Sequence, residues 1–135
     1  MIKLVASDLD GTLLMKGAQG LPEDIFPLIR QLKDLGILFI AASGRQYANI
    51  RRLFAPLGFD IPYIAENGSM CVYKEEILAT GLTPSKTIRH ILDALMEYRK
   101  IYHTGHCILS VKDTYYSDST DERFIDYMEN DMHNI

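Results

Sequence analysis

The sequence has no tryptophan and only two cysteines, Cys71 and Cys107, neither of them in a C-x-x-C pair. Two cysteines are too few for a disulfide framework, so we interpret both as reduced thiols of a cytoplasmic protein. A basic cluster is also lacking and the net charge is −4, which argues against binding to nucleic acid or to acidic lipid. The longest apolar run, residues 37–42, is far too short to cross a membrane, and Met1 leads almost directly into an apolar strand, leaving no room for a signal peptide.

What the sequence does contain is a hydrophobic content of 47% in 135 residues, enough for a folded core of one small domain or of part of a larger one. A short apolar run near the N-terminus predicts a buried strand that ends at two carboxylates, Asp8 and Asp10. Because residues i and i+2 share a face of an extended backbone, both carboxylates can reach one ligand. Gly11 then permits a sharp turn, since glycine tolerates a positive φ.

Paired carboxylates at the end of a strand can bind Mg²⁺ together with the oxygens of a substrate phosphate. An Asp carboxylate can attack phosphorus, and a second carboxyl can protonate the leaving oxygen and later activate water. A simple Asx turn that caps the next segment explains an isolated Asp-x-Asp-Gly about equally well. The neighbouring strands therefore decide between the two interpretations.

The second predicted strand, residues 37–42, ends in another polar turn, Ser43-Gly44-Arg45. A helix separates it from the first strand, so the two form a βαβ unit with a right-handed crossover. Their carboxyl ends meet at one edge of the sheet, which brings Ser43 beside Asp8 and Asp10. The Ser43 hydroxyl and the backbone N–H groups at the start of the next helix can hold a phosphate. Ser-Gly-Arg alone is common turn chemistry, and its place after a matching strand favours the phosphate site.

A third predicted strand, residues 62–65, ends at Glu66-Asn67-Gly68, where Asn67 either lines a substrate pocket or makes a plain Asn-Gly turn. His103 and His106, next to Cys107, have no further ligand nearby in the sequence, which argues against a metal site there. Two helices are predicted between these strands, one from Pro22 or Asp24 to Leu35 and one over 45–57. A hairpin with strands 70–73 and 77–79 follows the third strand, and then a helix from residue 83 with Ser85 as its N-cap. The last predicted elements are a strand over 108–111 that continues through 115–116 and a helix capped by Ser119 or Thr120.

The motif Asp8-Leu9-Asp10-Gly11-Thr12-Leu13 strongly resembles the first motif of haloacid dehalogenase-like (HAD) phosphatases. The run Ala42-Ser43-Gly44-Arg45 is similar to the second motif of their Cof-type branch, and Asn67-Gly68 to a segment that this branch carries at the same edge. The resemblance implies that Asp8 is the nucleophile and first Mg²⁺ ligand. It implies that Asp10 is the general acid/base and binds the metal through its backbone carbonyl. The implied substrate and phosphate contacts are Thr12, Ser43, Gly44, Arg45 and Asn67.

The resemblance also implies a fold and a division into domains. We expect an α/β fold, with a partial, doubly wound parallel-sheet HAD core over residues 1–83, including a hairpin at 69–80. The start of a subclass IIB α/β cap is expected over 84–135. The family's lysine and its acidic Gly-Asp-x-x-Asn-Asp motif are not recognisable here, and a subclass IIB chain is expected to be about twice as long. We therefore expect a truncated chain whose first strand is an open edge, prone to pair with a second copy, and whose Mg²⁺ binding is weak.

Three functions remain in competition. The leading one is a Mg²⁺-dependent HAD-type phosphatase that hydrolyses small phosphorylated metabolites through an aspartyl-phosphate intermediate and is impaired in this chain. The alternative is a non-catalytic fragment that keeps the phosphate site and acts by binding or association. A response-regulator-like receiver is the weakest, because its acceptor Asp ends a later strand than the first.

Overall fold

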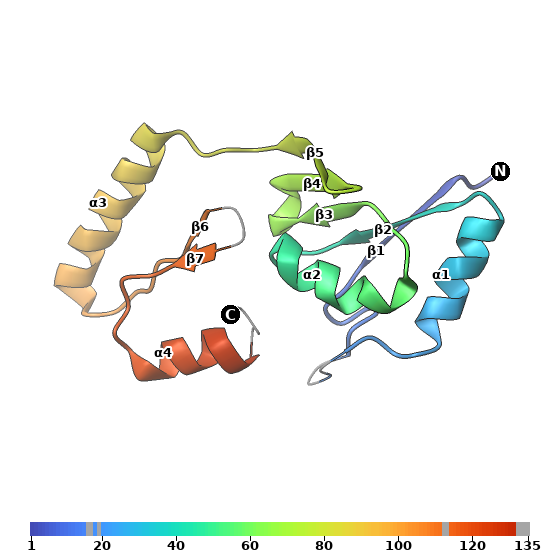
Figure 1. Ribbon diagram of the computed structural model, residues 1–135. Coiled ribbons are helices and arrows are strands. Elements are labelled where there is room, and N and C mark those ends of the chain that lie inside the picture. The colour runs from blue at the N-terminus through green and yellow to red at the C-terminus, as the bar shows by residue number, and fades with distance from the viewer. Residues whose placement is uncertain (16–17, 19, 112–113, 132–135) are drawn as a thin grey trace. The chain divides into compact units, whose positions relative to one another are not determined.

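The computed structural model describes residues 1–15, 18, 20–111 and 114–131, and these fall into two compact units, Met1–Gly81 and Leu82–Ile135 (Figure 1). The first unit contains a five-stranded sheet with the strand order β1-β2-β3-β4-β5. The strands are β1 (Leu4–Asp8), β2 (Leu38–Ala42), β3 (Tyr63–Ala65), β4 (Met70–Tyr73) and β5 (Glu76–Thr80). β1, β2 and β3 are parallel, whereas β4 and β5 add to the sheet in antiparallel fashion. The predicted α/β class is therefore confirmed, and β1 lies at the edge of the described sheet.

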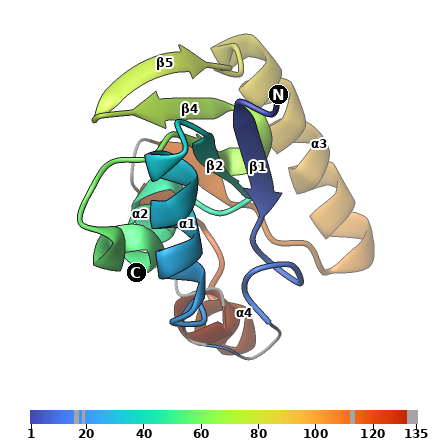
Figure 2. The same ribbon diagram turned by 90° about the vertical axis from the view of Figure 1, so that its right-hand side faces the viewer.

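Two helices of the first unit, α1 (Ile25–Asp34) and α2 (Tyr47–Phe54), lie on the same face of the sheet. Parallel strands that follow one another in a single direction place their right-handed crossover helices on one side. Consistent with this, the Arg30 guanidinium on α1 donates hydrogen bonds to the carbonyls of Pro56 (2.8 Å) and Leu57 (3.2 Å), in the 3-10 turn that follows α2. Figure 2 shows both helices on the same side of β1.

The core of the first unit lies between these helices and the sheet. Its buried members are Leu9, Leu14, Leu21, Ile29, Phe39, Ala41, Ile50, Phe54, Leu57, Ile61, Tyr63 and Ala65. The Phe54 ring packs against those of Phe39 and Tyr63, with centroids 5.9 and 6.3 Å away. Leu4 and Leu38, whose side chains are on the other face, remain 48% and 40% exposed, so the described helices cover one face of the sheet.

The second unit consists of α3 (Ser85–Tyr102), the strands β6 (Leu109–Val111) and β7 (Thr114–Tyr116), α4 (Glu122–Asp126) and a π-helical turn over Tyr127–Asp131. The prediction that the strand at 108–111 continues through 115–116 is wrong. The chain reverses between the two segments, and they pair as an antiparallel hairpin with Leu109 opposite Tyr116. None of the described residues of this unit is fully buried.

Two predicted helix caps are also wrong. Ser85 is the first residue of α3 and Pro84 is the N-cap, which makes no side-chain hydrogen bond. α4 is capped by Asp121, whose carboxylate accepts from two backbone N–H groups of the helix, at 2.9 and 3.4 Å. A carboxylate suits this position better than a hydroxyl because it also interacts favourably with the positive end of the helix dipole. The Ser119 hydroxyl instead accepts from the Asp121 N–H and contacts His106. No helix in the described ranges is long and apolar enough to cross a membrane.

Candidate active site at the carboxyl edge of the sheet

The carboxyl ends of the three parallel strands meet at one edge of the first unit. Asp8 is opposite Ala42 in the β1–β2 register, and Ala42 is opposite Ile64 in β2–β3. The segments that follow the strands are joined by backbone hydrogen bonds: the Ser43 N–H donates to the Ile64 carbonyl (2.9 Å), and the Asn67 N–H donates to the Ser43 carbonyl (3.3 Å). These bonds fix the loops after β2 and β3 relative to each other, and the β1–β2 register places the loop after β1 at the same edge.

The first loop alternates exposed and buried side chains. Leu9 is completely buried in the core, whereas Asp8 and Asp10 on either side of it are exposed. The Leu9 carbonyl accepts hydrogen bonds from the N–H groups of Thr12 (3.0 Å) and Leu14 (2.8 Å), which closes a tight turn. Gly11 occupies a left-handed conformation (φ 82°) within this turn, as its position after the aspartates predicted. The turn thus anchors Leu9 and leaves both carboxylates at the edge.

Asp10 is held by Arg45, which follows β2. The Arg45 Nε lies 2.9 Å from Asp10 Oδ2 and 3.2 Å from Oδ1, and its Nη2 lies 2.7 Å from Oδ1. The Arg45 side chain is 12% exposed and that of Asp10 is 53% exposed. Hydrogen bonds from Arg45 are the main reason that the pKa of Asp10 is lowered from its ordinary value. Burial opposes this shift, while the charge of Arg45 and the Ser43 hydroxyl add to it.

Ser43 lies beside Asp10, as the parallel crossover predicted. Ser43 is buried; its Oγ is 3.5 Å from Asp10 Oδ2 and accepts from the Arg45 N–H at 3.2 Å. Thr12 is placed differently, because none of the hydrogen bonds among the described residues joins its hydroxyl to Asp10 or Ser43. Ser43 and Arg45 therefore touch the Asp10 side chain, and the Thr12 N–H contributes to the turn. A contact of these three residues with phosphate stays a prediction.

Gly44 and Asn67 are packed against each other. A Cβ added at Gly44 would be 2.8 Å from Asn67 Oδ1, so only glycine fits beneath this side chain as it stands. Asn67 itself is in the left-handed region (φ 55°, ψ 32°), a conformation that Asn tolerates better than most residues. The turn function weighed for Asn67 is thus present, and a contact with substrate stays a prediction.

Two buried polar residues at this edge, Gln46 and Asn49, were missed by the sequence analysis. Asn49, on α2, is 5% exposed, and its Oδ1 accepts a hydrogen bond from Arg45 Nη1 at 3.1 Å. Gln46, the N-cap of α2, is 4% exposed, and its Nε2 has no hydrogen-bond partner among the described residues. The available signal was a pair of polar residues within a helix whose other face is apolar, with Asn49 four residues after Arg45.

The oxygen donors at this edge fit part of a magnesium shell. The exposed Asp8 carboxylate and the Asp10 backbone carbonyl are hard oxygen donors, and Mg²⁺ commonly takes only one or two carboxylates, completing its shell with water and substrate phosphate. The described residues contain no group of three or more His, Cys, Asp or Glu side chains that could enclose a metal ion. The chain thus offers a partial site with oxygen-only chemistry.

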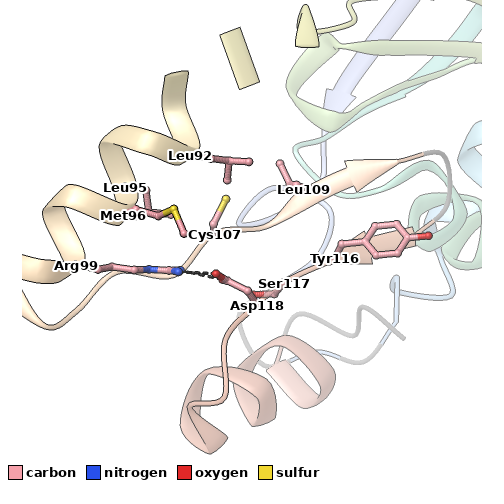
Figure 3. A pocket seen from close by; sticks show the side chains of 9 residues that line it. All are labelled: Leu92, Leu95, Met96, Arg99, Cys107, Leu109, Tyr116, Ser117 and Asp118. Carbon is pink, nitrogen blue, oxygen red and sulfur yellow. Dashed lines mark hydrogen bonds and ion pairs between the residues drawn. The ribbon is translucent and has the colours of Figure 1, made fainter. Parts of the chain in front are cut away.

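The second unit has an apolar cavity of about 360 Å³ between α3 and the β6–β7 hairpin (Figure 3). Leu92, Leu95 and Met96 line it from α3, and Leu109 and Tyr116 from the strands. Its charged lining groups are Arg99 and Asp118, which pair with each other at 2.6 Å. All the residues that line this cavity belong to the second unit.

The chain is similar to a known hydrolase family and to known phosphatases. The family model of haloacid dehalogenase-like hydrolases matches residues 5–135. The Escherichia coli 5-amino-6-(5-phospho-D-ribitylamino)uracil phosphatase YbjI is 30% identical over 95 residues, which cover 70% of this chain and 35% of YbjI. The Saccharolobus solfataricus phosphoglycolate phosphatase 1 is 40% identical over 77 residues, covering 56% of this chain and 34% of that enzyme.

A similar solved structure is that of the HAD subclass IIB sugar phosphatase BT4131. It superposes with a TM-score of 0.73 at 20% identity over 97% of this chain and 49% of the other. At this identity the match supports the fold alone. The chain therefore spans about a third to a half of the length of these proteins.

Proposed function

The chain belongs to the haloacid dehalogenase-like hydrolase family. From this membership and the geometry of the sheet edge, we propose that it functions as a Mg²⁺-dependent phosphatase. The proposal depends on one observation: the Asp10 side chain contacts Ser43 and Arg45, which are more than thirty residues away in the sequence. The exposed Asp8 is two residues before Asp10. The proposed substrates are small phosphorylated metabolites. The relatives described above support this class, because their names specify phosphate monoesters of small organic molecules.

In the proposed first step, a carboxylate oxygen of Asp8 attacks the phosphorus atom and the bond from phosphorus to the leaving oxygen breaks. Asp10, in its protonated form, gives its proton to that oxygen, and the alcohol departs. Ser43 Oγ–H and backbone N–H groups after β2 bind the phosphoryl oxygens, with Gly44 allowing close approach of the backbone. We also place Asn67 and Thr12 around this phosphoryl group, as the resemblance implies.

In the second step a water molecule attacks the phosphorus of the aspartyl-phosphate, and the Asp10 carboxylate takes its proton. Inorganic phosphate leaves and the Asp8 carboxylate is restored. The lowered pKa of Asp10 favours the ionised form, which suits this base step. The acid step needs the protonated form, which the hydrogen bonds from Arg45 oppose. A bound Mg²⁺, held by Asp8 and the Asp10 carbonyl, would reduce the repulsion between the anionic nucleophile and the phosphate. With only these two ligands, we expect its binding to be weak.

The test is hydrolysis of p-nitrophenyl phosphate and of 2-phosphoglycolate with and without Mg²⁺, comparing the native chain with Asp8→Asn. Asp24→Asn is the matched control, because Asp24 is an exposed carboxylate whose side chain makes no capping hydrogen bond at the start of α1. Mg²⁺-dependent turnover that is lost in Asp8→Asn and kept in Asp24→Asn supports the proposal. Equal turnover in the two variants contradicts it.

The second candidate function is phosphate binding or association without catalysis. It is favoured by the partial metal site and by the pairing of Asp10 with Arg45. The open edge of β1 provides a surface for pairing with a second copy, and we propose homo-oligomerisation through it. A stable monomer at micromolar concentration, measured by light scattering, would argue against that pairing. The two free cysteines support our proposal of a cytoplasmic location.

A further inference from the structure

Arg45 carries the most connected side chain at the candidate active site, and its bonds point away from a simple phosphate-binding role. The two nitrogens on one side of its guanidinium, Nε and Nη2, both bond to the Asp10 carboxylate. Its third nitrogen, Nη1, donates to Asn49 Oδ1 at 3.1 Å. A planar guanidinium bound on two sides is fixed in orientation as well as in position. Arg45 is therefore arranged to hold Asp10.

The Asn49 side chain is a polar amide buried on α2. It is 5% exposed on α2, on the same helix as the fully buried Ile50 and Phe54. A buried amide costs free energy unless it is hydrogen-bonded, and an apolar side chain would pack at such a position without that cost. The bond that Asn49 accepts from Arg45 offsets the cost and ties the guanidinium to the rigid helix.

We propose that Asn49 is a positioning residue, which acts through Arg45 to hold the Asp10 carboxylate at the distance and angle that proton transfer requires. This inference rests on the proposed function, since it assigns Asp10 the proton transfer. These hydrogen bonds form a relay that runs from α2 through Asn49 and Arg45 to Asp10 in the turn after β1. The relay adds a side-chain link between the loops after β1 and β2, which the sheet already places at one edge. Ser43 completes it, because its hydroxyl accepts from the Arg45 N–H and contacts Asp10.

The relay makes a specific kinetic prediction for three variants. Asn49→Leu removes the acceptor and should lower kcat for p-nitrophenyl phosphate about tenfold, with KM changed by less than about twofold, because a misplaced proton donor slows the chemical step. Asn49→Asp keeps an oxygen acceptor for Nη1 and should restore most of the lost kcat. Arg45→Lys keeps the charge, loses the planar fork and should reproduce the kcat loss. Since the Arg45 position is on the loop, Arg45→Lys also tests the relay if Asn49→Leu fails to fold.

Arg51→Lys is the matched control for the arginine change. Arg51 also pairs with a carboxylate, that of Glu75 at 2.6 Å, but both side chains are more than half exposed. Its substitution should leave kcat and KM unchanged. A rise in KM with unchanged kcat in Asn49→Leu and Arg45→Lys, together with weaker binding of inorganic phosphate, would overturn the proposal and make Arg45 a substrate ligand.

An NMR measurement separates this inference from the proposed function, because it needs no turnover. In the native chain the Arg45 Nε–H should exchange slowly with water, and its signal should be distinct from that of exposed arginines. Asn49→Leu should speed this exchange several-fold, whereas Asn49→Asp should not. Unchanged exchange in Asn49→Leu would overturn the relay whether or not the chain hydrolyses phosphate esters.

Discussion

Leu9, between the two aspartates, should contribute more to stability than any exposed residue of the same strand region. Its side chain is completely buried, and its carbonyl anchors the turn that leaves Asp8 and Asp10 exposed. Truncation of a buried leucine removes its transfer free energy and leaves a cavity, together about 2–5 kcal/mol. Because Leu9 is wholly enclosed, we expect Leu9→Ala to lower the free energy of unfolding of the first unit by about 3 kcal/mol.

Leu4 is the control, since it lies on β1 and is 48% exposed. Half of its apolar surface is already in water, so Leu4→Ala should cost about 1 kcal/mol or less. Urea denaturation followed by circular dichroism measures the total, and hydrogen exchange of the β2 amides reports on the first unit alone. Equal losses in Leu9→Ala and Leu4→Ala would refute the view that the motif is anchored through the core.

Three further predictions concern single groups. Burial raises the pKa of Tyr63 from 10.0 to about 12. Between these pH values the folded chain keeps the phenol proton and the unfolded chain loses it, so the free energy of unfolding should fall as the pH rises. Tyr63→Phe should remove this part of the alkaline loss in urea titrations, and an unchanged loss would contradict the assignment. Gly44→Ala should displace the Asn67 side chain, whose Oδ1 would be 2.8 Å from the new Cβ, and shift its NMR amide signals, whereas Gly20→Ala enters open space and should not. Unmoved Asn67 signals in Gly44→Ala would show that the contact is loose. Asp121→Ala should destabilise α4 by about 1 kcal/mol by removing its N-cap, seen as faster amide exchange in α4, and Asp121→Asn should restore most of the protection. Equal exchange in all three chains would contradict the cap.

The arrangement of the first unit was predictable because it depends on long, simple patterns. Two short apolar runs separated by an amphipathic helix predict a parallel pair, and the handedness of the crossover then places Ser43 beside Asp10. The Asn-Gly turn after β3 and the antiparallel hairpin that follows are equally local signals. The edge on which the candidate site lies therefore followed from sequence alone.

What could not be predicted depends on side-chain contacts or on the reversal of a short segment. The apolar and aromatic residues around β6 and β7 fit one long strand as well as a hairpin, and only the pairing of Leu109 with Tyr116 distinguishes them. Arg45 and Asn49 are only four residues apart, but the bond from Arg45 to Asp10 spans thirty-five residues, and no spacing rule indicates it. The contact of Arg45 with phosphate, which its motif implies, stays a prediction, whereas the pairing of its guanidinium with Asp10 was not indicated by the sequence. The local motif therefore identified Arg45 as a candidate functional side chain, whereas its pairing with Asp10 depends on the tertiary structure.

Locating the phosphoryl group during turnover tests most directly the proposal that Asp8 is the nucleophile. Asp10→Asn should slow hydrolysis of the intermediate, so that acid quenching with p-nitrophenyl phosphate and Mg²⁺ present traps it for peptide mass spectrometry. We expect one added phosphoryl group on the peptide that contains Asp8, and none when Asp8→Asn is combined with Asp10→Asn. A phosphoryl group on another residue, or turnover by the native chain with no adduct on Asp8 in any variant, would contradict that proposal.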